Sequence, residues 1–160
     1  MRTTSAIVAV AVWLLGGAGS AEAKSLPEAC KILTAAKIKA LLGVDFAEGT
    51  SAPSYTGGST CKFTGLGKTP GRLILQIGDK KYASARSAYG GKIVDVAGIA
   101  DAAFYQVPTS GITGATLDKG GNSNAVVIKG TTHALLTIYS PDKYNRAQVA
   151  ALLTWVAGQL

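Results

Sequence analysis

Residues 125–139 read AVVIKGTTHALLTIY, and the rest of the chain can be arranged around this stretch. Two apolar runs rich in β-branched residues flank Gly130 and Thr131, and glycine at the first central position suits a two-residue type II′ hairpin turn. Such a turn pairs Ile128 with His133 and leaves both faces of the hairpin largely apolar. One face would carry Ala125, Val127, Ala134, Leu136 and Ile138, and the other Val126, Ile128, His133, Leu135, Thr137 and Tyr139. We therefore predict a central hairpin that is covered on both sides.

The start of the chain has the pattern of a secretory signal peptide. Arg2 supplies a positive charge, residues 6–15 form an apolar core, and residues 21–23 (AEA) match a small-x-small cleavage site. The apolar core is too short to span a bilayer as a helix. We expect residues 1–23 to be removed, which leaves residues 24–160 as a single periplasmic or secreted domain without a transmembrane segment.

Cys30 and Cys61 are the two cysteines of the chain. In an oxidising compartment they would form one disulfide, and closing a loop of about 32 residues stabilises a fold by roughly 3–4 kcal/mol in the chain-entropy model. A reactive dithiol is the alternative, but the Cys-x-x-Cys spacing typical of such sites is absent. Neither cysteine follows the leader closely enough to carry a lipid anchor. We predict a structural disulfide.

Apolar periodicity and turn residues divide the chain into helices and strands. The sequence predicts an N-terminal helix that begins with the capping pattern Ser25-x-x-Glu28 and starts again at Thr34, a short middle helix capped by Asp79, and a C-terminal helix capped by Ser140. Strands are expected over residues 60–64, 72–77, 92–96, 103–107 and 112–117, besides the hairpin. This pattern predicts an α+β domain with an antiparallel sheet of about five to seven strands, these three helical parts and one disulfide.

The C-terminal helix has the clearest pattern. Pro141 suits its first position and Asp142 its positive dipole end. Its apolar stripe consists of Val149, Leu152, Val156 and Leu160, joined by Leu153, with Trp155 beside it. Burying four such side chains is worth roughly 6–12 kcal/mol before entropy is subtracted.

Several short motifs match a known pattern: residues 30–36 (CKILTAA), 41–43 (LLG), 61–63 (CKF), 96–104 (VAGIADAAF) and 127–130 (VIKG). The chain resembles the exported bacterial envelope domains of unknown function that often occur on small lipoproteins, over nearly the whole mature sequence. The resemblance implies paired cysteines and an α+β fold similar to the photosystem-extrinsic-protein or helix-grip type. It implies no established activity and no catalytic residues. Lys37 stands where the family usually has a capping Glu, and Ala100 replaces a common Gly.

The sequence offers little for catalysis. His133 is the only histidine, and a Ser/His/Asp site would need Asp118 or Asp101 beside it, without any serine in a nucleophile-elbow context. A metal site built from Cys and His clusters is excluded by counting. We expect no enzyme activity, no cofactor and no metal, and a hydrolase is the remaining alternative.

The chain has a formal net charge of +7, and its bases are concentrated in one region. Between Cys61 and Lys92, a single acid, Asp79, accompanies seven bases. They are Lys62, Lys68, Arg72, Lys80, Lys81, Arg86 and Lys92. Side by side, they would present a positive patch to an anionic envelope component or a protein partner. The alternative is that this charge only keeps an exported protein in solution. We expect no nucleic-acid partner, because export removes the usual one and no recognition motif is present.

A small-ligand pocket is the second functional hypothesis. Tyr105, His133, Leu135, Thr137 and Tyr139 could line the less well covered side of the sheet, giving an apolar concavity with a few polar groups. The alternative is that a helix packs on this side. The sequence therefore favours a binding module, which acts on an anionic partner or, alternatively, carries or senses a small ligand.

Overall fold

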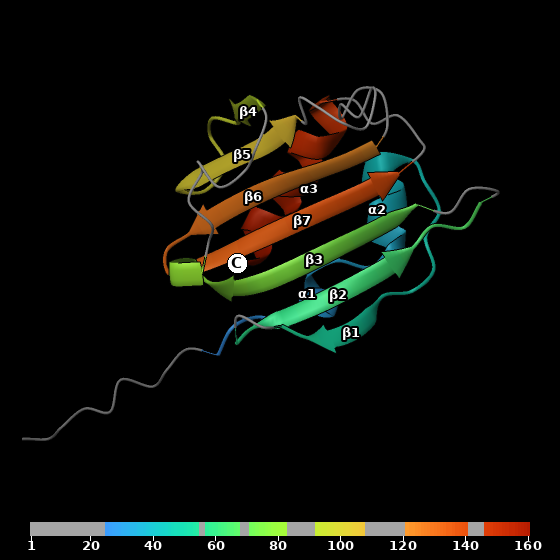
Figure 1. Ribbon diagram of the computed structural model, residues 1–160, viewed down its shortest axis with the longest axis horizontal. Coiled ribbons are helices and arrows are strands. Elements are labelled where there is room, and N and C mark those ends of the chain that lie inside the picture. The colour runs from blue at the N-terminus through green and yellow to red at the C-terminus, as the bar shows by residue number, and fades with distance from the viewer. Residues whose placement is uncertain (1–24, 55–56, 68–70, 83–91, 108–120, 141–145) are drawn as a thin grey trace, which may run out of the picture.

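Seven strands form one antiparallel sheet in the order β1-β2-β3-β7-β6-β5-β4 (Figure 1). The computed structural model describes residues 25–54, 57–67, 71–82, 92–107, 121–140 and 146–160. The strands are β1 (Thr50–Pro53), β2 (Ser59–Thr64), β3 (Arg72–Asp79), β4 (Lys92–Asp95), β5 (Ala102–Val107), β6 (Gly121–Lys129) and β7 (Thr132–Ser140). The helices are α1 (Ala29–Ile32), α2 (Ala35–Leu42) and α3 (Arg146–Gln159), with a 3-10 turn η1 (Lys80–Tyr82). The predicted α+β class, the antiparallel sheet and its two terminal helical parts are confirmed.

The predicted middle helix is not seen. Residues Lys80–Tyr82 form a single 3-10 turn, in which Asp79 Oδ1 accepts a hydrogen bond from the backbone N–H of Lys81 at 2.9 Å. The rest of that predicted helix falls on residues 83–91, which lie outside the described residues. The predicted strand over residues 112–117 and the first turn predicted for the C-terminal helix, residues 141–145, also lie outside them.

The hairpin of β6 and β7 has the predicted register. Ile128 pairs with His133 and Lys129 with Thr132, so Gly130 and Thr131 form a two-residue turn. Gly130 has a φ of 58°, whereas Thr131 is not among the described residues with positive φ, and this combination fits type II′ and excludes type I′. The hairpin occupies the middle of the sheet, because β3 pairs with the outer side of β7 and β5 with the outer side of β6.

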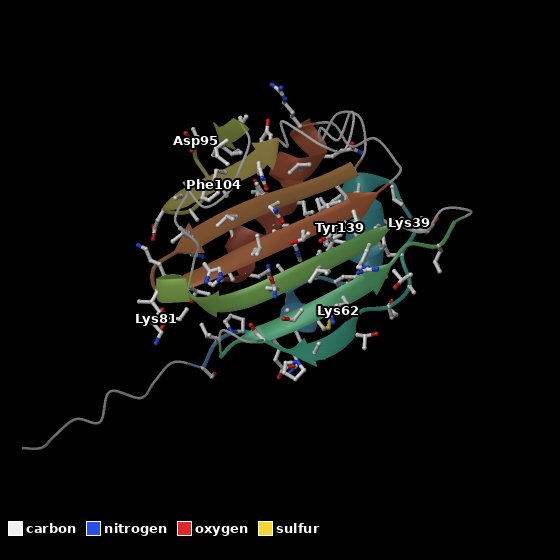
Figure 2. The ribbon with its side chains drawn as sticks, viewed as in Figure 1. Lys39, Lys62, Lys81, Asp95, Phe104 and Tyr139 are labelled. Atoms are coloured by element: carbon white, nitrogen blue, oxygen red, sulfur yellow. A yellow bond between two sulfur atoms is a disulfide. The ribbon has the colours of Figure 1, made fainter. Side chains whose placement is uncertain are left out.

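The two faces of the sheet differ. All three described helices lie on one side, which we call the helical face, while Lys62, Phe104 and Tyr139 lie on the other, which we call the opposite face (Figure 2). The helical face holds the main core, including Phe63, Leu75, Leu136 and Val127 with zero exposure. On the opposite face, the prediction that the hairpin is covered is correct for Val126 and His133, which are buried. It is wrong for Tyr139, which is 38% exposed.

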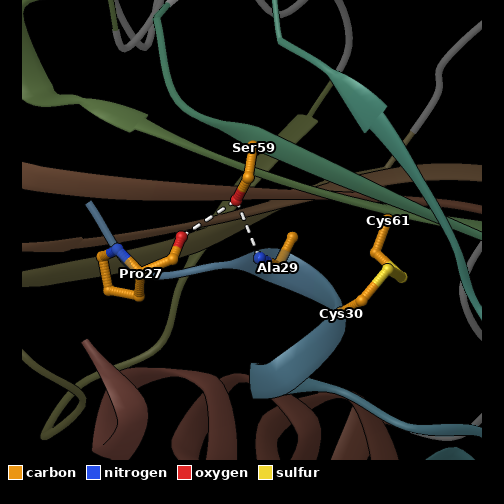
Figure 3. The surroundings of a disulfide bond; sticks show 5 residues. All are labelled: Pro27, Ala29, Cys30, Ser59 and Cys61. Carbon is orange, nitrogen blue, oxygen red and sulfur yellow. Dashed lines mark hydrogen bonds between the residues drawn. A yellow bond between two sulfur atoms is a disulfide. The ribbon is translucent and has the colours of Figure 1, made fainter. Parts of the chain in front are cut away.

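The N-terminal segment is fastened to β2 in two ways (Figure 3). Cys30 and Cys61 form the predicted disulfide. Beside it, the Ser59 hydroxyl accepts a hydrogen bond from the Ala29 backbone N–H at 2.7 Å and donates one to the Pro27 carbonyl at 2.9 Å. The predicted capping by Ser25-x-x-Glu28 is wrong, because Glu28 is the N-cap of α1 without a side-chain cap, and a distant serine satisfies the backbone instead.

Helix α2 begins and ends at the residues that the sequence predicted, and it packs against α3. Thr34 caps α2 by accepting a hydrogen bond from the Lys37 backbone N–H at 3.3 Å, and Gly43 ends the helix with a φ of 74°. The Lys37 ammonium lies 3.7 Å from the centre of the Trp155 ring, and Trp155 donates a hydrogen bond to the Ile32 carbonyl at 2.9 Å. Lys37 thus makes a cation–π contact that connects α2 with α3.

Candidate functional site

A cavity of about 560 Å³ opens on the opposite face between β1 and β7. Its lining comes from the end of β1, from β2 and β3 at its floor, and from β7. The lining residues are Ala52, Pro53, Ser54, Thr60, Lys62, Ile74, Gln76, Thr137 and Tyr139. The volume lies within the usual range for small-molecule sites, and the lining combines apolar surface with a few polar groups.

Strand register explains why these side chains meet. Lys62 pairs with Ile74, and Ile74 pairs in turn with Thr137, so the three form one row across β2, β3 and β7. Thr60 and Gln76 form the adjacent row. Because side chains alternate along a strand, Thr60 and Lys62 project away from the helical face, on which their neighbours Cys61 and Phe63 are buried. Two polar positions of β2 thereby become part of the cavity.

The Thr60 hydroxyl is the unusual polar group of this cavity. Thr60 is only 3% exposed, and its Oγ1 has no hydrogen-bond partner in the described part of the chain. A buried hydroxyl without a partner costs about 1–3 kcal/mol, and such groups are rare in folded proteins. Thr60 also belongs to the lining of the cavity, so a polar group that enters there is a candidate for the missing partner once the buried Oγ1 atom is uncovered.

Lys62 is the charged group of the cavity. Its side chain is exposed, and within the part of the chain that the structure describes no carboxylate pairs with it. The described ion pairs involve other bases, namely Lys31, Lys39 and Lys81. None of the described lining residues is acidic, so this part of the lining carries a positive charge without a carboxylate beside it.

Thr137 is held by a polar chain that crosses the opposite face. Its Oγ1 donates to Asn124 Oδ1 at 2.9 Å, and Asn124 Nδ2 donates to Gln106 Oε1 at 2.8 Å. Because the Thr137 hydroxyl proton is used in this chain, its oxygen faces the cavity as an acceptor only. Other lining side chains that carry hydrogen-bond donors are Thr60, Lys62, Gln76 and Tyr139.

Tyr139 separates the cavity from a second hollow. This neighbouring hollow has a volume of about 360 Å³ and is lined by Thr64, Gly71, Arg72 and Tyr139. The Arg72 guanidinium lies 5.8 Å from the centre of the Tyr139 ring, within cation–π range. Arg72 thus brings a second positive charge to the aromatic wall of the cavity.

Two of the five predicted pocket residues, Thr137 and Tyr139, line the cavity. Leu135 and His133 lie on the same face without lining it, and the buried His133 has its Nδ1 2.8 Å from the Asp79 carbonyl oxygen. Tyr105 belongs to the core of the helical face, because it pairs with Ala125 and shares its side of the sheet.

The predicted basic residues do not gather in one place. Lys62 and Arg72 lie on the opposite face next to the cavity and the second hollow, whereas Lys80 and Lys81 lie at the other end of β3 (Figure 2). Lys81 is within 3.9 Å of the Asp79 carboxylate. The other three predictions, Lys68, Arg86 and the Lys92 side chain, lie outside the described residues.

The residues considered for catalysis have structural contacts. Asp101 Oδ2 accepts a hydrogen bond from the Gly130 backbone N–H at 2.6 Å and so supports the β6–β7 turn, while Asp118 lies outside the described residues. Within the described ranges, no group of His, Cys, Asp and Glu side chains could hold a metal ion. None of the helices described here is long and apolar enough to cross a membrane.

Sequence reasoning missed most of the cavity. Thr60 and Lys62 could have been placed on the face away from Cys61 by alternation within β2. The contributions of Ala52 and Gln76 depend on the strand order, in which β1 and β3 flank β2, and no local pattern encodes that order.

No protein-family model, no curated protein and no solved structure matches this chain.

Proposed function

We propose that the protein is an exported, non-enzymatic binding module that holds a small ligand in the cavity on the opposite face of its sheet. The observation that carries this proposal is the cavity of about 560 Å³, whose lining contains the buried Thr60 hydroxyl and the Lys62 ammonium, neither of which has a partner among the described residues. Rigid strands position these groups, and a binding site on strands keeps its geometry better than one on loops.

An exported location agrees with the disulfide. A bond between Cys30 and Cys61 persists in an oxidising compartment such as the periplasm or the cell exterior. The signal-peptide pattern and the resemblance to envelope domains support the same location. The proposal is a periplasmic or secreted module of the cell envelope.

Ala52→Trp should block the cavity. Ala52 lines it from the edge strand β1, and an indole at this position would fill the space between β1 and β3. A ligand present at a hundred times its Kd stabilises the folded state by about 2.7 kcal/mol. In a thermal-shift screen of amphipathic small molecules, we expect a stabilising compound for the unchanged protein and loss of its effect in the variant.

Ser51→Trp is the matched control. Ser51 is exposed, precedes Ala52 on β1 and pairs with Cys61, so its side chain lies on the other side of the sheet and this variant should keep the ligand-induced stabilisation. The proposal fails if no compound in the screen stabilises the protein, or if both tryptophan variants respond to the ligand equally.

Binding to an anionic surface is the second candidate function. The observation that favours it is the exposure of Lys62, Arg72, Lys80 and Lys81, which all belong to the base-rich region between β2 and η1. Acidic lipid headgroups or acidic polymers of the envelope are partners of the matching charge.

The protein should then be retained on phosphatidylglycerol-containing vesicles at low salt and released as salt rises, because salt screens exposed charges. We expect Lys80→Glu/Lys81→Glu to weaken retention in a co-sedimentation assay. Lys31→Glu/Lys39→Glu changes the net charge equally at two exposed lysines of α1 and α2 and should have less effect. Equal losses in both double variants would indicate a net-charge effect without a defined surface.

A further inference from the structure

We infer that the ligand of the cavity carries a single carboxylate attached to an apolar or aromatic body. This inference rests on the proposed function and adds the chemical class of the ligand. In this inference, Lys62 pairs with the negative charge, Thr60 donates a hydrogen bond to the carboxylate, and Tyr139 packs against the apolar body.

The charge of the lining sets the charge of the ligand. Among the described residues that line the cavity, Lys62 is the only base and no acid accompanies it. An anion that enters the cavity therefore gains a charge-assisted contact, which is roughly twice as strong as a neutral hydrogen bond. One lysine in the lining matches one negative charge, because Arg72 lies against the other side of the Tyr139 ring and lines the second hollow.

The hydroxyl groups of the lining determine which hydrogen bonds the ligand can form. Thr60 Oγ1 has no partner among the residues that the structure describes, so its proton can be donated to a carboxylate oxygen. Thr137 already donates its proton to Asn124 and offers only an acceptor. Strand β2 thus presents two donors, Thr60 and Lys62, which are two positions apart and lie on the same face.

The remaining lining residues indicate that the rest of the ligand is apolar or aromatic. Ile74 at the floor and Pro53 at the end of β1 supply apolar surface, and Tyr139 supplies an aromatic wall that is 38% exposed. An aromatic ring placed against Tyr139 gains stacking energy in addition to burial. The Arg72 guanidinium contacts the Tyr139 ring from the second hollow. Its charge makes the electrostatic potential near the ring more positive.

Three probes that share one aromatic body test the inference: naphthylacetate, its neutral analogue naphthylacetamide, and naphthyl phosphate. In isothermal titration calorimetry, naphthylacetate should bind about tenfold more tightly than the amide. Lys62→Gln should remove this preference, whereas Lys80→Gln, which changes the net charge equally outside the cavity, should preserve it. Thr60→Val should weaken naphthylacetate binding by about three- to tenfold without lowering Tm, because valine keeps the shape of threonine and removes the unpartnered hydroxyl.

The outcomes separate this inference from the proposed function. Equal binding of the acid and the amide, with both lost in Ala52→Trp, would overturn the carboxylate and leave the ligand site intact. Tighter binding of naphthyl phosphate than of naphthylacetate would overturn it in favour of a phosphate ligand. If naphthylacetate does not bind while another compound stabilises the protein in a manner that Ala52→Trp removes, the inferred class is wrong. If no compound binds, the proposed function fails with it.

Discussion

Replacing both cysteines, in the variant Cys30→Ala/Cys61→Ala, should lower the free energy of unfolding by about 3–4 kcal/mol. The disulfide joins residues separated by 31 positions, and its loss restores conformational freedom to the unfolded chain. Alanine suits both sites, since Cys61 is fully buried and a serine hydroxyl there would need a partner. The difference can be measured by urea denaturation at equilibrium.

Reduction of the unchanged protein is the internal control. A reducing agent should lower its stability by a similar amount and leave the double variant unaffected. A variant as stable as the oxidised protein would show that the hydrogen bonds of Ser59 with Pro27 and Ala29 are enough to hold the N-terminal segment.

The disulfide also matters for the candidate site. Cys61 lies between Thr60 and Lys62 on β2, with its side chain on the helical face and theirs on the opposite face. The bond to Cys30 therefore holds the strand that presents both proposed donors. The stability of β2 and the geometry of the cavity therefore both depend on this disulfide.

Much of the fold could be predicted because its signals are local. The Gly130 turn fixed the register of β6 and β7, and Thr34 and Gly43 marked the two ends of α2. Ala100 has a φ of 50° and thus occupies a conformation that favours glycine. These features depend on neighbouring residues, which the sequence displays directly.

Features that depend on distant residues were predicted poorly. The N-terminus of α1 is satisfied by Ser59, which lies 30 positions away from Ala29 and replaces the local cap that the sequence suggested. The cavity similarly requires β1, β2, β3 and β7 to be neighbours in that order. Tyr105 was placed on the wrong side because the pairing of β5 with β6, which decides its face, has no local marker.

Leu152→Ala should lower the free energy of unfolding by about 2–5 kcal/mol, the usual range for removing a fully buried leucine side chain. Leu152 has zero exposure and belongs to the stripe of α3 that includes Val149 and Val156. This stripe packs on β6 and α2 in the main core, where a truncated side chain leaves a space that its neighbours fill only in part. Urea denaturation with an unchanged m-value would attribute the loss to the folded state.

Thr154→Ala provides the control on the same helix. Thr154 is exposed and its hydroxyl donates to the Ala150 carbonyl at 2.8 Å, so its replacement should change stability by no more than about 0.5 kcal/mol. Leu152→Ala should also leave the affinity for a cavity ligand within about twofold at temperatures where the protein is folded, because distant sites act independently. Leu152 lies on the helical face and the cavity on the opposite face, so a large loss of affinity would show that the two faces of the sheet are coupled.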